Sequence, residues 1–308
     1  MEIYLPIAEQ SMNVFVLLAL GGAAGLLAGM FGVGGGFLAT PLLIFVGIPP
    51  AVAVASQANQ VVANSISSLQ VQWRRGNVDL RMGLILLLGG MVGSSAGVTL
   101  FTYLKRIGQI DFVIAVLYVV MLSAIGGLMM YESLGTWLKR RRNPTAPRGK
   151  LHTHYLVHRL PWKMRFYKSK LYISAFLPIG LGFVIGVLSA ILGVGGGFVL
   201  VPAMIYLLGM PTTVVIGTSN FQILFVAANV TFLQATTNGT VDVVLALLLI
   251  LGGVVGAPIG ARIAAKLPGV VLRGLMAVLI LAVAVELLTE LLRTPASPSS
   301  IGLREAQP

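Results

Sequence analysis

The sequence predicts an all-α polytopic membrane protein built from two homologous repeats. Hydrophobic residues make up 57% of the 308 residues and charged residues only 10%, well below the roughly 25% charged residues of soluble domains. Long apolar segments with almost no charge, many of them rich in glycine, indicate membrane-spanning helices. This composition argues against a soluble enzyme or a disordered protein, and the absence of cysteine argues against a disulfide-bonded scaffold.

The apolar segments form two sets of five on either side of a basic stretch. Most reach the roughly 20 residues that a helical crossing needs, but the second segment of each set is short and follows a glycine cluster. The first set covers 14–31, 36–48, 51–73, 79–104 and 110–132, and the second covers 171–192, 197–209, 213–236, 241–265 and 270–292. We therefore divide the chain into a first transmembrane repeat (14–132), a basic linker (133–170), a second repeat (171–292) and a polar tail (293–308).

Two matching motifs show that the halves repeat one another. Residues 25–41 read GLLAGMFGVGGGFLATP and residues 186–202 read GVLSAILGVGGGFVLVP, with nine of 17 positions identical. Further along, GGMVG at 89–93 matches GGVVG at 252–256. Short, Gly-interrupted segments at matching positions of two halves are typical of transporter binding sites.

The placement of lysine and arginine bears on membrane topology. Five crossings per half give an inverted repeat, because the second half then enters the membrane from the opposite side. With the N-terminus outside, this topology places 17 of the 21 basic residues in inside loops, as the positive-inside rule expects. If each Gly-broken pair is one crossing, the repeats are parallel and 16 basic residues lie inside. We prefer the inverted topology, although charge alone leaves both open.

The basic stretch at 139–170 carries 11 lysines and arginines and no acid. Charge concentrated in one loop indicates a cytoplasmic segment and argues against nucleic-acid binding. The stretch either contacts anionic headgroups or serves only to set the topology. Its three histidines share no helix face and have no neighbouring acid, so we expect no metal site.

Each half contains a Gly-Val-Gly-Gly-Gly-Phe box that is expected to break a helix. A dinucleotide fingerprint needs a third glycine where Phe37 stands, so the box does not indicate nucleotide binding. A helix restarting after consecutive glycines presents free N–H groups and a positive dipole end, which can hold an anion. We predict such an anion site, with tight turns or close helix packing as the alternative reading. The candidate residues are Gly34, Gly35, Gly36, Phe37, Gly195, Gly196, Gly197 and Phe198.

Glycines recur at every fourth position in three of the apolar segments. This spacing gives a helix one smooth face, so that another backbone can approach closely. We predict that these faces pack against other helices. They contain Gly21, Gly25 and Gly29, then Gly89, Gly93 and Gly97, and then Gly252, Gly256 and Gly260.

The third segment of each half carries an unusual number of amides and hydroxyls. Such groups are costly in hydrocarbon unless they are hydrogen-bonded, so they should face the protein interior or a watery cavity. Their donors suit an oxyanion, and hydrogen bonds between helices are the alternative. The candidates are Ser56, Gln57, Asn59, Thr218, Ser219, Asn220 and Gln222.

No predicted span has a charged residue at its centre. Asp79 and Asp242 begin their segments, where an acid is expected to cap a helix. Catalysis needs a nucleophile with a base or a metal with ligands, and the spans offer neither. We therefore expect no enzyme activity and no cofactor.

The two glycine boxes, each followed by Pro41 or Pro202, make the sequence resemble the sulfite exporter TauE/SafE family of membrane transporters over about residues 14–292. The resemblance implies a helical carrier of small sulfur-containing anions, such as sulfite or an organosulfonate, in the cytoplasmic membrane. We expect export by alternating access at a midplane site between the repeats, with a passive anion channel as the alternative. The expected partners are the anion and the lipid bilayer, with no nucleic acid, and the oligomeric state stays open.

Overall fold

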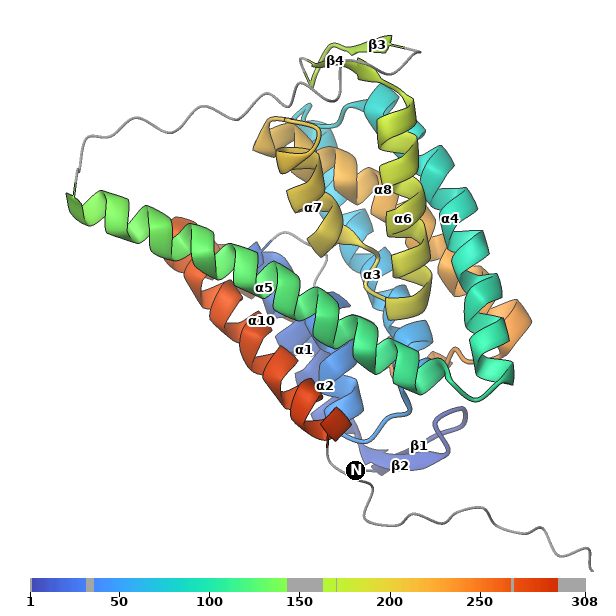
Figure 1. The fold of residues 1–308 in the computed structure, drawn as a ribbon. Coiled ribbons are helices and arrows are strands. Elements are labelled where there is room, and N and C mark those ends of the chain that lie inside the picture. The colour runs from blue at the N-terminus through green and yellow to red at the C-terminus, as the bar shows by residue number, and fades with distance from the viewer. Residues whose placement is uncertain (1, 32–35, 143–162, 170, 267–268, 293–308) are drawn as a thin grey trace, which may run out of the picture.

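The computed structural model describes residues 2–31, 36–142, 163–169, 171–266 and 269–292, and helices dominate it (Figure 1). The helices of the first half are α1 (Val14–Phe31), α2 (Gly36–Phe45), α3 (Pro50–Arg74), α4 (Leu80–Arg106) and α5 (Ile110–Arg142). Those of the second half are α6 (Phe176–Leu192), α7 (Gly197–Tyr206), α8 (Thr212–Leu233), the π-helical turn η2 (Gln234–Asn238), α9 (Val243–Lys266) and α10 (Gly269–Leu292). The predicted all-α polytopic fold is confirmed.

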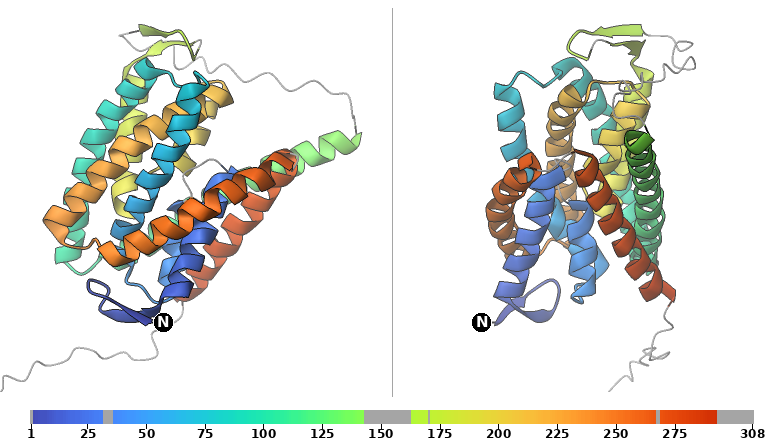
Figure 2. Two further views of the ribbon diagram at one scale, coloured as in Figure 1. Left: turned by 180° about the vertical axis from the view of Figure 1, so that it is seen from behind. Right: turned by 90° about the vertical axis from the view of Figure 1, so that its left-hand side faces the viewer.

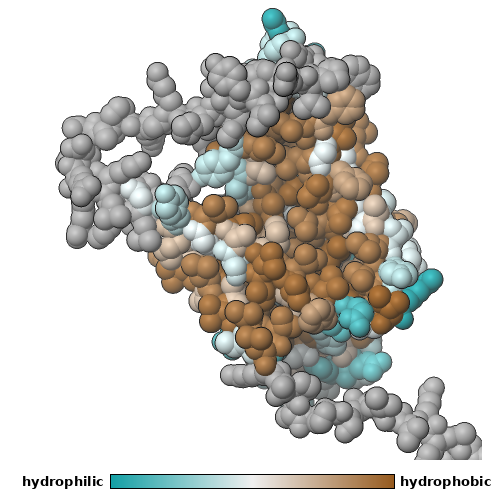
Figure 3. All heavy atoms as spheres, in the orientation of Figure 1, coloured by the Kyte–Doolittle hydropathy of each residue, from teal (hydrophilic) through white to brown (hydrophobic). Residues whose placement is uncertain are grey.

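Five helical stretches among the described residues are long and apolar enough to cross a membrane. They are Leu80–Arg106, Ile110–Tyr131, Thr213–Asn238, Val243–Gly260 and Gly274–Leu292. Shorter apolar helices include α2 and α7, which begin at the two glycine boxes. Apolar side chains cover most of the face seen in Figure 3, and hydrophilic ones gather toward its ends, as expected for a protein that lipid surrounds.

Two short antiparallel hairpins were not predicted from the sequence. Strand β1 (Glu2–Leu5) pairs with β2 (Gln10–Asn13), and β3 (Lys163–Phe166) pairs with β4 (Leu171–Ser174). Each hairpin comes directly before the first helix of its half. The two hairpins lie at opposite ends of the molecule (Figure 1; Figure 2), so α1 and α6 start from opposite ends.

Helices of one half pack mainly against helices of the other. α1 packs along α9, and α6 packs along α4 in the same way. α3 contacts α8, its counterpart in the other half, and α5 contacts α10. Replacing each helix by its counterpart in the other half turns the α1–α9 contact into the α6–α4 contact and leaves the α3–α8 and α5–α10 contacts unchanged. The repeat in the sequence is therefore also a repeat in the packing.

The glycine-faced helices make the closest of these crossings. A Cβ on Gly25 of α1 would lie 2.5 Å from the carbonyl oxygen of Gly253 in α9, and one on Gly21 would lie 2.6 Å from that of Leu249. Gly93 of α4 faces the backbone of Phe183 in α6 just as closely. A side chain at these positions would force the helices apart, so the predicted packing role of the glycines is confirmed.

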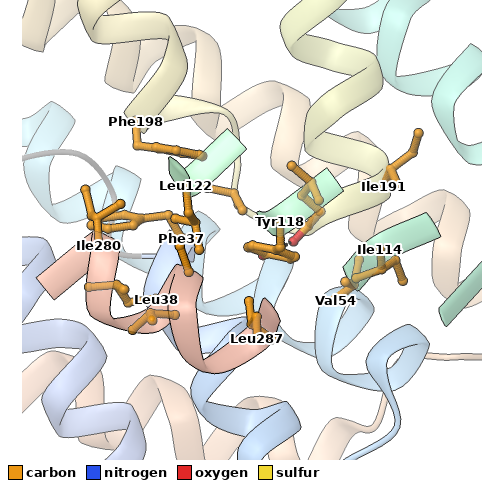
Figure 4. Close-up of a cluster of buried hydrophobic side chains, with 14 of the residues drawn as sticks. Phe37, Leu38, Val54, Ile114, Tyr118, Leu122, Ile191, Phe198, Ile280 and Leu287 are labelled. Carbon is orange, nitrogen blue, oxygen red and sulfur yellow. Dashed lines mark hydrogen bonds between the residues drawn. The ribbon is translucent and has the colours of Figure 1, made fainter. Parts of the chain in front are cut away.

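The hairpins α1–α2 and α6–α7 reach the middle of the molecule from opposite ends. The rings of Phe37 and Phe198, each the last residue of its glycine box and in the first turn of the helix that follows, stack there with centroids 5.3 Å apart. Figure 4 shows them beside Tyr118, Leu122 and Ile280, which α5 and α10 contribute. Phe37 of the first box and Phe198 of the second therefore belong to one apolar cluster at the centre of the fold.

Candidate functional site

Two hydroxyls of the predicted site connect the halves of the protein. The Asp242 backbone N–H, directly before α9, donates to Ser56 Oγ of α3 at 2.9 Å. The Asp79 N–H, directly before α4, donates to Thr218 Oγ1 of α8 at 3.0 Å. All four residues are buried. Ser56 and Thr218 are thus equivalent, and each ties a central helix of one half to the start of a helix in the other.

The carboxylates of the same two aspartates cap helices and hold the strand hairpins. Asp79 accepts from Met82 N in the first turn of α4 (3.2 Å), and from the N–H and hydroxyl of Ser169 between β3 and β4 (3.0 and 2.6 Å). Asp242 accepts from Leu245 N (3.1 Å) and from Ile7 N between β1 and β2 (3.0 Å). The predicted capping role is confirmed. Because the hairpins lie at opposite ends, and Ser56 and Thr218 bond the two aspartates that hold those hairpins, the two hydroxyls lie toward opposite ends as well.

Three other predicted site residues bond within their own helix. Asn59 Nδ2 lies 3.4 Å from Ser56 O, and Ser219 Oγ donates to Ile216 O at 3.2 Å. Asn220 Nδ2 donates to Ile216 O and also crosses to Ser68 Oγ of α3, both at 2.8 Å. Asn220 therefore forms a hydrogen bond between helices, which is the alternative role weighed for this cluster. A role of Asn220 in binding an anion stays a prediction.

Gln60 is a buried polar residue that the sequence candidates left out. Its Nε2 donates to Gly21 O of α1 (3.1 Å) and Leu249 O of α9 (2.9 Å), and its Oε1 accepts from Gln57 Nε2 (2.8 Å). It stands four residues after Ser56, as Gln222 stands four residues after Thr218. That shared spacing was the available signal in the sequence.

Some buried polar atoms have no hydrogen-bond partner among the described residues. They include Gln57 Oε1 and both side-chain polar atoms of Gln222. The Gln222 amide is directed at α4, because a Cβ on Gly90 would lie 2.6 Å from its Nε2. Gln222 is therefore the predicted site residue with the most unused hydrogen-bonding capacity.

The glycine box of the second half forms a tight, buried turn. Gly195 and Gly196 adopt φ values of 68° and 74°, a left-handed conformation that favours glycine. α7 restarts at Gly197 with no side-chain cap, so the N–H groups of its buried first turn have no capping side chain. Gly34 and Gly35 lie outside the described residues, and Gly36 is buried at the start of α2.

Apolar side chains surround Gly36 and the second box in this conformation. A Cβ on Gly36 or Gly195 would meet Val61 of α3, and one on Gly195 would also meet Ile223 of α8. The structure brings Gly36, Phe37 and the second box together between α3 and α8. The adjacent amides of Gln60 and Gln222 point away from the boxes, toward the α1–α9 and α4–α6 crossings.

Tyr118 of α5 forms a hydrogen bond to the residue directly before the second box. Its buried hydroxyl donates to Leu192 O, the last residue of α6, at 2.5 Å. We expect Tyr118→Phe to lower the free energy of unfolding by about 1–2 kcal/mol, because the carbonyl then loses a buried partner. Thermal melting in detergent measures this. Tyr131→Phe, at a residue that is 83% exposed, is the control, and an equal effect of both variants would contradict the role of the hydroxyl.

Comparison with known proteins places this arrangement among membrane transporters. The family model "Sulfite exporter TauE/SafE" matches residues 17–287. A "Probable membrane transporter protein" of Xylella fastidiosa (strain 9a5c) is 31% identical over 245 residues, which cover 79% of this chain and 81% of that one. Two proteins of Bacillus subtilis (strain 168), named probable membrane transporter proteins YunE and YjnA, are 27% and 28% identical over 78% and 79% of this chain and 85% and 87% of their own. No solved structure gives a significant match.

Proposed function

The chain belongs to the sulfite exporter TauE/SafE family, and from this premise we propose that it exports a small sulfur-containing anion of the sulfite or organosulfonate class across the cytoplasmic membrane. The protein is a multi-pass membrane transporter, as its family and its apolar helices indicate. The proposed mechanism is alternating access at a midplane site between inverted repeats. The observation that carries it is the meeting of two glycine-box hairpins, one from each half, at the stacked rings of Phe37 and Phe198.

The opposite placement of the two strand hairpins supports the inverted topology. Each hairpin precedes the first helix of its half and binds an equivalent aspartate, yet they lie at opposite ends (Figure 1). Exposed basic residues favour the β3–β4 end as the cytoplasmic one, because the positive-inside rule places lysine and arginine there. They include Arg74, Arg75, Arg81 and Lys168, whose Nζ donates to Gly76 O and Val78 O.

Binding would use uncharged donors, since the spans lack a central basic residue. The first N–H groups of α2 and α7 are the main candidates, and the positive dipole end of each helix favours an anion there. The amide of Asn220, which joins α8 to Ser68 of α3, is the side-chain candidate for a further contact. A site of this kind releases its anion readily, because no buried cation holds it.

The apolar packing at the boxes favours a carrier over a channel. Val61 packs against Gly36 and Gly195, Ile223 packs against Gly195, and the rings of Phe37 and Phe198 stack on each other. An anion passes only when these apolar groups separate, so each turnover requires a conformational change. A passive channel would need a continuous polar path through the same region.

Counterflow in proteoliposomes tests the proposal. Vesicles that contain the purified protein and unlabelled sulfite are expected to accumulate labelled sulfite, with a rate that saturates. Sulfoacetate and taurine identify the accepted class, and sulfate and chloride serve as comparison anions. Absence of flux with every sulfur anion would overturn the transport proposal. Flux that neither saturates nor shows counterflow would overturn the carrier in favour of the channel.

Asn220→Ala is expected to reduce the rate of counterflow about tenfold, the effect of losing one hydrogen bond to a charged ligand. The variant should also lose the thermal stabilisation that the accepted anion gives to the parent, because only binding to the folded state raises the melting temperature. Ser67→Ala is the control, since that exposed hydroxyl of α3 bonds only to Ala63 O of its own helix. An Asn220→Ala variant that melts and transports like the parent would remove Asn220 from the site.

A further inference from the structure

Gln60 and Gln222 occupy equivalent positions in the two halves. Each stands four residues after the hydroxyl that accepts the N–H of a capping aspartate in the other half. Each is fully buried. Each also has its Nε2 directed at a glycine of a helix crossing, since a Cβ on Gly253 would lie 2.6 Å from Gln60 Nε2 and one on Gly90 would lie 2.6 Å from Gln222 Nε2.

The two glutamines nevertheless have different hydrogen bonds. Gln60 bridges two carbonyl oxygens of the α1–α9 crossing, those of Gly21 and Leu249. The equivalent oxygens of the α4–α6 crossing belong to Gly182 and Leu86, whose backbones meet just as closely. Gln222 donates to neither of them, and neither of its polar atoms has a partner among the described residues.

This difference is what two halves in different states would show. A buried amide without a partner is unfavourable and calls for an explanation, and a second arrangement in which the bond forms supplies one. In a protein of inverted repeats, rocking one repeat against the other gives each half the packing that the other half had before. Gln222 then forms the hydrogen bonds and Gln60 loses them.

We propose that Gln60 and Gln222 form an exchangeable pair of clamps, of which only one is closed in each end state of the transport cycle. In the state described here, Gln60 clamps α1 to α9. In the opposite state, Gln222 bonds the carbonyl oxygens of Leu86 and Gly182 and clamps α4 to α6, while Gln60 releases its partners. The inference rests on the proposed alternating access, and its test reads conformation separately from flux.

A fixed difference in sequence is the competing explanation. Ser219 stands in the second half where Gln57 stands in the first, and its hydroxyl bonds to its own helix. Gln222 Oε1 therefore lacks the donor that Gln60 Oε1 has. This explains the unbonded oxygen of Gln222 but not its unbonded Nε2, because the two carbonyl oxygens are present in both halves.

Cysteine reactivity can follow the two states, because the chain has no cysteine of its own. Ser65→Cys in α3 and Ala227→Cys in α8 are equivalent reporter positions, both buried here. They lie on opposite sides of the centre, since α3 and α8 run from opposite ends. Each reporter is introduced alone, the protein is solubilised in detergent, and the rate of maleimide labelling is measured for both.

Gln60→Leu and Gln222→Leu are expected to change the ratio of the two labelling rates in opposite directions. Each substitution removes the clamp of one end state, and losing one net hydrogen bond shifts the balance of the states about threefold. Gln70→Leu, at an exposed glutamine of α3, should leave the ratio unchanged. Gln60→Met and Gln222→Met serve as a second pair if a leucine variant melts below the assay temperature.

The outcomes separate the two proposals. Shifts in the same direction, or no shift with either glutamine variant, would overturn the exchange of clamps. Opposite shifts in a protein that gives no counterflow with any sulfur anion would support the exchange and overturn the proposed substrate class. Counterflow together with an unchanged ratio of the two labelling rates would support the transport proposal and overturn the proposed exchange of clamps.

Discussion

Gly186→Ala is expected to lower the free energy of unfolding by about 3 kcal/mol, at the upper end of typical overpacking effects. A Cβ on Gly186 would overlap the carbonyl oxygen of Gly90 and lie 2.7 Å from Ser94 N, so both obstacles are backbone atoms of α4. Rotating a side chain cannot relieve such a contact, and α4 and α6 must separate. Thermal or denaturant unfolding in detergent measures the loss, together with the yield of folded protein.

Gly180→Ala provides a matched control in the same helix. A Cβ there would meet no atom within 4 Å, and alanine is the better helix former by about 1 kcal/mol. This variant should melt at or slightly above the temperature of the parent. If the two alanine variants lost equal stability, the α4–α6 crossing would not depend on the absence of a side chain at Gly186.

Asp242→Ala is expected to destabilise the protein by a similar amount, about 3 kcal/mol. The substitution removes the cap on Leu245 N and the acceptor that holds Ile7 N of the β1–β2 turn. A lost cap costs about 1 kcal/mol and a lost hydrogen bond to a buried charged group about 1.5–3 kcal/mol. The melting temperature and protease sensitivity of the N-terminal hairpin report the two effects separately.

Two further variants give this prediction its contrast. Asp242→Asn keeps one acceptor oxygen and should fall between the parent and the alanine variant. Asp111→Ala removes an exposed acid from the first turn of α5 and should cost less than about 1 kcal/mol. Equal losses for Asp242→Ala and Asp111→Ala would show that the buried hydrogen bonds of Asp242 do not stabilise the fold.

Much of the fold was predictable because its signals are local in the chain. Hydropathy and length identify the helices, and the glycine boxes locate the breaks before α2 and α7. The four-residue glycine spacing identifies the faces that pack, and Asp79 and Asp242 mark helix starts. The strand hairpins escaped prediction, since each strand has only four residues, too few for a reliable pattern.

The candidate site was predictable only as a set of residue types. Sequence patterns selected the polar clusters of α3 and α8. In the structure, the residues of these clusters form different kinds of contact. Ser56 and Thr218 bind helix starts at opposite ends, Asn220 joins two helices, and Gln222 is left with unbonded atoms. Gln60, which the candidates left out, makes more hydrogen bonds across the fold than its predicted neighbours Gln57 and Asn59.

The sequence by itself determined that this chain is a membrane protein of two related halves, because composition, periodicity and repetition are properties of neighbouring residues. Only the tertiary structure decided which groups meet. Ser56 and the Asp242 N–H lie 186 positions apart, and nothing local in the chain links them. The different bonding of Gln60 and Gln222 also arises only after folding, because equivalent residues in a repeated sequence differ when the two halves have different surroundings.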